Sequence, residues 1–169
     1  MENLFLFLAT SLVFRLPSSK KLKNHFIGNT GCSALLLPHA RGFMHTTGDG
    51  DRLYLQEFEE GKMSFGIICI HLQDGYTLQE ARAVLGNYID KLRDSFGIRH
   101  CVGAQATEDW NSVCSHSLVD YWQDGQRCDW KVKGYTNGRV LSVLYVKNIA
   151  QGAATRHDHF LDSFHFGAA

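Results

Sequence analysis

Three consecutive residues near the C-terminal end, His157, Asp158 and His159, have side chains of the types that bind metal ions, and His165 follows shortly after. Imidazole and carboxylate groups together could hold a divalent metal. On a helix, however, residues two apart point in different directions, so His157 and His159 would converge only in an irregular loop. We favour the solvated start of a helix here, and we therefore assign no metal ligand.

A second candidate is the pair Cys114 and His116, because a thiolate activated by an imidazole is a nucleophile. Two residues apart share a face only if the segment is extended, and the flanking sequence NSVCSHS is typical of a loop. No Asn or Asp is evidently placed to orient the histidine. We therefore predict no catalytic residue at this position.

Two glycine-rich segments resemble fragments of ligand-binding loops. The segment Gly48–Asp51 lacks both the alternate ligands and the final glutamate of a calcium loop, which favours a plain turn. The segment Gly28–Gly31 does not have the spacing of a dinucleotide or phosphate loop. We therefore expect no bound cofactor.

The cysteines give no metal or redox motif, because no two of them have C-x-x-C spacing. The five are Cys32, Cys69, Cys101, Cys114 and Cys128. If the chain is exported, one disulfide could form, and Cys101–Cys114 is the most plausible pair. An odd count leaves at least one thiol, and we expect most of the cysteines to be small buried apolar side chains.

Aromatic residues gather in the C-terminal half: Trp110, Tyr121, Trp122, Trp130 and Tyr135. Exposed aromatic side chains commonly anchor protein interfaces. Core packing is the alternative, and it is favoured for Trp130, which lies on the apolar side of an alternating strand. Tyr121 and Trp122 are neighbours and point opposite ways, so we expect one of them to face solvent or a covering helix.

Composition excludes some classes of protein. The 169 residues have a formal net charge of zero, with 17 basic and 17 acidic side chains, so there is no basic excess for nucleic acid. The densest basic cluster is Lys20, Lys21 and Lys23, in a segment that looks like a linker. The chain is 44% hydrophobic, which indicates one folded domain with a substantial core.

Residues 4–14 form an apolar run that is too short to span a bilayer as a helix but fits the core of a secretion signal. Glu2 stands where such signals usually carry a basic residue, so a first element of the folded core is the alternative. We predict a signal segment at 1–19, a linker at 20–29 and a single domain at 30–166. The mature chain would then be secreted or periplasmic, with no stable membrane span. The alternative location is the cytoplasm.

The first half of the domain contains one short strand, one hairpin and one long helix. A strand over Cys32–Leu37 is followed by a loop, and residues 52–59 and 63–72 form a hairpin around Glu60-Gly61. The clearest helix is 77–96, where Thr77 and Glu80 form a capping box. We expect its apolar face to be buried through Leu78, Ala81, Leu85, Tyr88 and Leu92.

The second half is a strand at 100–107 followed by a three-stranded meander at 118–149. Its tight turns are expected at Asp124-Gly125 and Asn137-Gly138. Residues 140–146 are apolar on both faces, which predicts a central strand covered on both sides. Thr155 with Asp158 could cap a last short helix over residues 156–164, which would bury Phe160, Leu161 and Phe164.

These elements predict an α+β fold in which one mostly antiparallel sheet carries a long helix and a short C-terminal helix. The order, and the ending HFLDSFHF, resemble the PsbP-like α/β/α sandwich superfamily over about residues 30–166. That superfamily includes the photosystem II extrinsic subunit, a Ran-binding protein and bacterial exported proteins of unknown function. Its members mostly bind partners and share no catalytic residue set, so the resemblance implies a binding role and no site residue.

Three functions remain open. The leading hypothesis is an exported, non-enzymatic binding or accessory domain with a protein partner and an unknown ligand. The second is a small metal-dependent or cysteine hydrolase that uses His157 and His159 or the pair Cys114 and His116. The third is a cytoplasmic protein-interaction domain. A hydrolase requires the largest pocket to be lined by those histidines or that pair.

Overall fold

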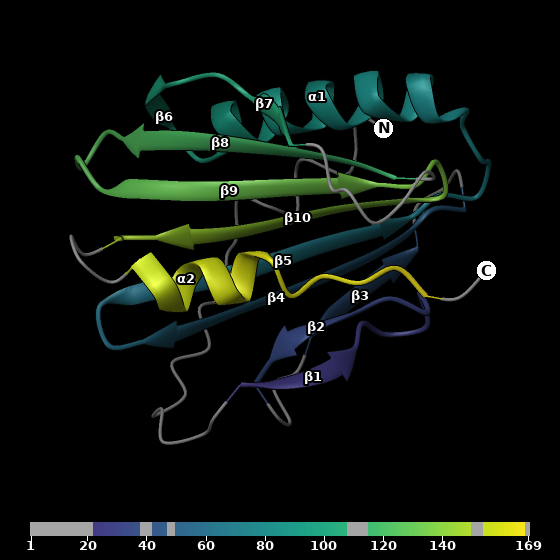
Figure 1. Cartoon of the computed structure of the whole chain (residues 1–169), viewed down its shortest axis with the longest axis horizontal. Helices are drawn as coiled ribbons and strands as arrows, with labels where there is room; N and C mark the ends of the chain where they lie inside the picture. Colours follow the sequence, from purple (N-terminus) through teal and green to yellow (C-terminus); the bar gives the residue numbers. More distant parts are fainter. Residues whose placement is uncertain (1–21, 38–41, 47–49, 108–114, 150–153, 168–169) are drawn as a thin grey trace.

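The computed structural model describes residues 22–37, 42–46, 50–107, 115–149 and 154–167 (Figure 1). Ten strands and two helices lie within these residues. In chain order they are β1 (Lys23–Phe26), β2 (Ser33–Leu36), β3 (Phe43–Thr46), β4 (Arg52–Glu60), β5 (Met63–His71), α1 (Leu78–Ser95), β6 (Ile98–Cys101), β7 (Gln105–Thr107), β8 (His116–Asp124), β9 (Asp129–Thr136), β10 (Val140–Lys147) and α2 (Ala154–Leu161).

The main sheet is antiparallel and has eight strands in the order β3-β4-β5-β10-β9-β8-β6, with β7 also paired to β8. Strand β10 lies at its centre. Leu141 and Val143 pack into the apolar cluster on one face, and Val140 and Leu144 pack into the cluster on the other. The prediction of a central strand covered on both sides is therefore confirmed. The core consists of two layers with the sheet between them.

Helix α1 covers one face of the sheet. The predicted capping box is present: Glu80 N–H donates to the Thr77 hydroxyl, and Thr77 N–H donates to the Glu80 carboxylate. The buried residues of the helix are Ala81, Leu85, Tyr88, Ile89 and Leu92. The first residue of the predicted apolar face, Leu78, is only half-buried. The apolar contact with the sheet therefore begins one turn later than predicted.

The other face is covered by α2 and by a hairpin of β1 and β2 that forms its own two-stranded sheet. Figure 1 shows α2 in front of the sheet, next to β10 and over β5. Phe160, Leu161 and Phe164 are buried there, as predicted. Helix α2 begins at Ala154, so Thr155 lies inside the helix and is not its cap, contrary to the prediction.

Two strands lie where the sequence indicated irregular chain. The predicted linker at 20–29 contains β1 and the fully buried Ile27, so the folded part of the chain begins before residue 30. The predicted loop after Pro38 contains β3. Both strands are short edge strands with polar or exposed residues, so neither shows the alternation that marks a half-buried strand.

The hairpin between β9 and β10 is tight, but its loop is one residue later than predicted. Thr136 pairs with Leu141, and Asn137 N–H donates to the carbonyl of Val140 at 3.3 Å, which leaves Gly138 and Arg139 as the loop. Gly138 has a φ of 89°, which an L side chain rarely adopts. The Asn137 side chain accepts hydrogen bonds from the backbone N–H groups of Arg139 and Val140.

Two other connections also differ in detail. Between β8 and β9 the loop is longer than Asp124-Gly125, and its positive φ falls on Arg127 at 61°. The single strand predicted at 100–107 is two strands, β6 and β7, which pair with successive parts of β8. The break between them turns the chain at Val102, a residue that lies at the candidate site.

Candidate functional site

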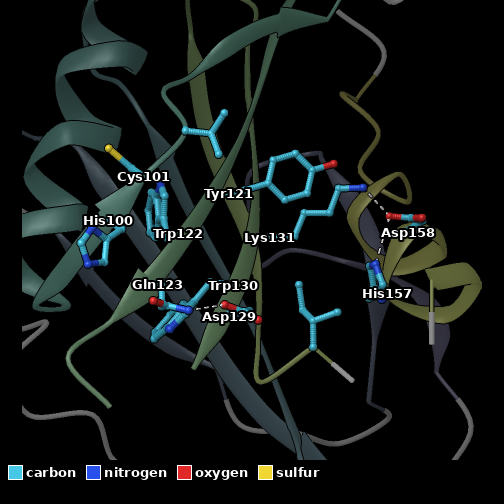
Figure 2. Close-up of a pocket in the computed structure, with 12 residues that line it drawn as sticks. His100, Cys101, Tyr121, Trp122, Gln123, Asp129, Trp130, Lys131, His157 and Asp158 are labelled. Atoms are coloured by element: carbon cyan, nitrogen blue, oxygen red, sulfur yellow. Dashed lines mark hydrogen bonds and ion pairs between the residues drawn. The ribbon is translucent and has the colours of Figure 1, made fainter. Parts of the chain in front are cut away.

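A hollow of about 670 Å³ lies on the α2 face of the sheet (Figure 2). Two cross-strand pairs of β8 and β9 form its floor: Tyr121 opposite Lys131, and Gln123 opposite Asp129. These four side chains point to the same face because each is two residues from the next on its strand. We call this hollow the β8–β9 groove.

The walls of the groove come from separate parts of the chain. His157 and Asp158 of α2 form one wall, and His100 and Cys101 of β6 with Val102 form the other. Figure 2 shows Tyr121 and Lys131 side by side, with Lys131 reaching toward Asp158. Backbone pairing holds the second wall in place, since Val102 N–H donates to the carbonyl of Tyr121 at 3.0 Å.

The charged groups of the groove have hydrogen-bonding partners within the protein. The Lys131 ammonium is 2.6 Å from the Asp158 carboxylate and 5.4 Å from the centre of the Tyr121 ring. Partial burial acts to lower the pKa of Lys131, but hydrogen bonds with Asp158 and Tyr121 outweigh it and raise that pKa. Gln123 donates to the Asp129 carboxylate at 2.9 Å. The floor therefore carries hydrogen-bonded pairs and one cation held in its charged form.

Strand β9 also holds α2 in place beside the groove. Lys133 contacts Asp162 at 2.8 Å, and the Tyr135 hydroxyl donates to the carbonyl of Leu161 at 2.6 Å. With the Lys131–Asp158 pair, these contacts tie one side of the helix to β9, while its apolar side is buried over the sheet. The wall is therefore a fixed part of the fold.

The structure does not bring the predicted metal ligands together. His157 is buried and lies 3.5 Å from the Asp158 carboxylate, while His159 and His165 are exposed. Within the described ranges, no three side chains of His, Cys, Asp or Glu are placed to hold one metal ion. The segment is helical, as favoured from the sequence, but His157 is buried and not solvated.

Several other candidates fall partly outside the described residues. Cys114 and Trp110 lie outside the described residues. The pairing of Cys114 with His116 and the predicted Cys101–Cys114 disulfide are therefore not described by the structure. Gly48 and Asp49 also lie outside, while the Asp51 carboxylate accepts a hydrogen bond from Gln73 N–H at 2.9 Å. That contact ties Asp51 to the start of the segment after β5.

The aromatic residues divide as the strand alternation predicted. Tyr121 is 46% exposed in the groove, whereas Trp122 and Trp130 are buried on the α1 face. There the Trp122 indole donates to Asp120 at 2.6 Å and the Trp130 indole donates to Asp124 at 3.1 Å. Tyr135 is buried under α2. Of these residues, Tyr121 is the one presented for contact.

Sequence reasoning missed most of the groove. Val102 is 68% exposed and lies beside Tyr121, yet it was assigned to the middle of a continuous strand. The alternation that puts Trp130 on the apolar side of its strand predicts no more for Asp129 and Lys131 than a polar face. The strand alternation places them on the face of Tyr121, but only the register of β8 against β9 brings them opposite Tyr121 and Gln123.

Comparison with solved structures identifies the fold. The solution structure of cyanobacterial PsbP (CyanoP) from Synechocystis sp. PCC 6803 superposes with a TM-score of 0.55 and 16% sequence identity. The superposition covers 88% of this chain and 94% of that chain. This chain has a PsbP-like fold. No protein-family model and no curated protein matches its sequence.

The predicted resemblance to the PsbP-like superfamily is therefore confirmed at the level of fold. The identity of 16% carries no site residue from one chain to the other. Among the helices in the described part of the chain, none has the length and apolar character needed to cross a membrane.

Proposed function

We propose that this protein is a non-enzymatic accessory domain that binds a protein partner through the β8–β9 groove. The observation that supports the proposal most directly is the pair Tyr121 and Val102, two exposed apolar residues that are joined by a backbone hydrogen bond and both line the groove. An exposed aromatic residue next to a hollow is a typical interface anchor.

His157 is the one of the histidines assigned to a hydrolase that lines the groove, and the paired charged groups beside it favour binding over catalysis. The charged groups of the groove are Lys131, Asp158 and Asp129, and each has a partner within the protein. Paired groups of this kind stabilise a surface and provide polar contacts at the edge of an interface. The PsbP-like fold agrees with an accessory role, since the superfamily consists mostly of proteins that bind partners.

We further propose that the domain acts outside the cytoplasm, in the periplasm or in the medium. The apolar run at residues 4–14 supports this location, and it lies outside the described residues. A cytoplasmic interaction domain is the alternative, and it would use the same groove.

The binding surface can be tested with a photo-reactive amino acid in place of Tyr121, incorporated in the full chain in the source organism. Tyr76 provides a matched control, because it is another exposed tyrosine and lies outside the groove. The Tyr121 probe should give a discrete protein adduct on irradiation, and the Tyr76 probe should not. Adding Val102→Asp to the Tyr121 probe should abolish the adduct without unfolding the protein, because Val102 is exposed.

Two results would contradict the proposed surface. One is no adduct from the Tyr121 probe in a protein that circular dichroism shows to be folded. The other is the same set of adducts from both probes, which would indicate non-specific contact.

A further inference from the structure

The two cross-strand pairs on the floor of the β8–β9 groove differ in how their charges are paired. Tyr121 lies opposite Lys131, and Gln123 lies opposite Asp129 two residues further along β8. The Lys131 ammonium is paired with the Asp158 carboxylate. Asp129 is exposed, and its carboxylate is hydrogen-bonded to the neutral amide of Gln123. The charge of Asp129 is therefore the one in the groove that is still available to a partner.

The groove as a whole carries negative charge. One lysine and two aspartates line it, so its formal charge is −1 when His100 and His157 are neutral. The side chain of Asp158 is 38% exposed and that of Lys131 is 19% exposed, and Asp129 is also exposed. A partner therefore meets more of the negative charge than of the positive charge, and a cationic group is its electrostatic complement.

The end of the groove at Asp129 also provides two hydrogen-bond acceptors. The Gln123 side-chain amide donates to one carboxylate oxygen of Asp129 at 2.9 Å (Figure 2). Within the residues that the structure describes, the other carboxylate oxygen and the Gln123 side-chain carbonyl accept no hydrogen bond. A guanidinium group has five N–H donors in a planar fork and can donate to both acceptors, whereas an ammonium group acts as a compact point charge.

An apolar contact surface lies beside these acceptors. Tyr121 and Val102 are exposed, and both line the groove. Neighbouring cross-strand pairs on one face of a sheet are two residues apart, which is about 6.4–6.8 Å. Side chains i and i+2 of an extended peptide have the same spacing and the same direction. One extended segment can therefore contact Tyr121 with one side chain and Asp129 with the next side chain on that face.

We infer that the segment bound in the groove is extended and carries an arginine two residues from an apolar side chain. The guanidinium group donates to Asp129 and Gln123, and the apolar side chain contacts Tyr121 and Val102. This assignment rests on the proposed function, because it names the chemistry of the partner at the same groove.

The test uses the full chain, labelled with nitrogen-15, and a synthetic pentapeptide Ser-Leu-Ser-Arg-Ser with both ends blocked. Titration should shift the NMR signals of the Gln123 side-chain amide and of the Tyr121 and Asp129 backbone amides. The backbone signal of Tyr76, which lies outside the groove, should not move.

Two further peptides separate charge from shape. Citrulline in place of the arginine keeps the shape without the charge, and lysine keeps the charge without the planar fork. We expect the citrulline peptide to bind about 2–5-fold more weakly than the arginine peptide, with the lysine peptide between them. Equal Kd values for the arginine peptide and either of the others would overturn the inference, and so would no shift at the groove with any of the three.

The variant Asp129→Asn should weaken binding of the arginine peptide by a similar factor and leave binding of the citrulline peptide unchanged. Asp74→Asn is the matched control, because Asp74 is exposed outside the groove and the change removes the same charge. An equal loss from the two variants would overturn the inference, since the effect would then come from net charge alone.

The outcome can be separated from that of photo-crosslinking at Tyr121. A discrete adduct from the Tyr121 probe, together with no preference for the arginine peptide, would reject this inference and leave the proposed function in place. A preference for arginine that depends on Asp129, without an adduct in the source organism, would support this inference and contradict the proposed protein partner.

Discussion

At the scale of single residues, the side chain of Tyr145 shows how the sheet builds a polar contact inside its core. The ring of Tyr145 on β10 lies over Gly66 of β5, and its hydroxyl donates to Glu57 on β4. These three residues are opposite one another in the register, since Gly66 pairs with both Tyr145 and Glu57. Gly66 is required because a Cβ there would lie 2.1 Å from the ring.

We predict that Gly66→Ala destabilises the protein by about 1–3 kcal/mol, because the methyl group must displace a buried ring in a packed core. The free energy of unfolding in urea measures this effect. The matched control is Gly86→Ala on α1, where a Cβ meets nothing within 4 Å and the helix gains propensity. That change should stabilise by about 0.5–1 kcal/mol. Equal losses from the two changes would mean that the Tyr145 ring does not lie over Gly66.

The Glu57 carboxyl has a raised pKa. Burial is the main cause, and it outweighs the hydrogen bond from Tyr145 and the attraction of Lys147, which both act to lower the pKa. A carboxyl with a raised pKa in the folded state costs stability when it ionises. The cost is absent below the pKa of the unfolded chain and grows until the pH passes the folded pKa.

We predict that wild-type stability falls across this window and that Glu57→Gln removes that part of the fall. Above the folded pKa, the variant should be the more stable protein, by about 1.4 kcal/mol for each unit of pKa difference. Urea unfolding of both proteins from about pH 4 to about pH 8 measures the difference. Parallel pH profiles would show that Glu57 ionises as easily in the folded protein as in the unfolded chain.

The direction of most side chains could be predicted at this scale, but their partners could not. Alternation along β10 placed Tyr145 on an apolar face, and alternation along β8 separated Tyr121 from Trp122. The contact between Tyr145 and Glu57 depends on the order and register of three strands, and two of them are far from the third in the sequence. Periodicity within one strand contains no information about that register.

At the scale of elements, α1 is attached mainly through one row of apolar side chains. Leu85 is fully buried, and its methyl groups lie with those of Ile89 over Gly134 of β9. The helix therefore contacts the middle of the meander.

We predict that Leu85→Ala destabilises by roughly 2–5 kcal/mol, through lost burial and the cavity left behind. Arg82→Ala is the control, because Arg82 is exposed on the same helix, and it should change stability by less than about 0.5 kcal/mol. Unfolding in urea measures both. A loss of stability from Leu85→Ala as small as that of the control would mean that Leu85 does not face the sheet.

Elements with strong internal patterns were predictable, and those that depend on a neighbour were not. Helix α1 has a cap and a stripe, and β10 has two apolar faces, so both were identified close to their observed bounds. Strands β1 and β3 have only four residues each, and their backbone pairing with β2 and β4 makes them strands. The two walls of the groove, at Val102 and at α2, are brought to the same face by tertiary contacts, which a local sequence pattern does not predict.

At the scale of the whole molecule, the proposed location outside the cytoplasm makes a prediction about processing. If residues 1–19 are a signal segment, protein made in a secreting host should begin near Ser19 or Lys20. Sequencing the N-terminus of the exported protein tests this. An intact N-terminus on exported protein would contradict the signal segment. Protein that stays wholly in the cytoplasm would favour the alternative, a cytoplasmic interaction domain.

The position of β10 at the centre of the sheet also determines the order in which this protein can be completed during synthesis. Strands β3–β5 and β6–β9 are made first, as two separate half-sheets, and each has an edge strand, β5 or β9, to which β10 will pair. Until the ribosome has released residues 140–147, those two edges have no partner within the chain. Unpaired N–H and C=O groups of an edge strand recruit other strands, so a chain truncated before Val140 should aggregate even though most of its core residues are present.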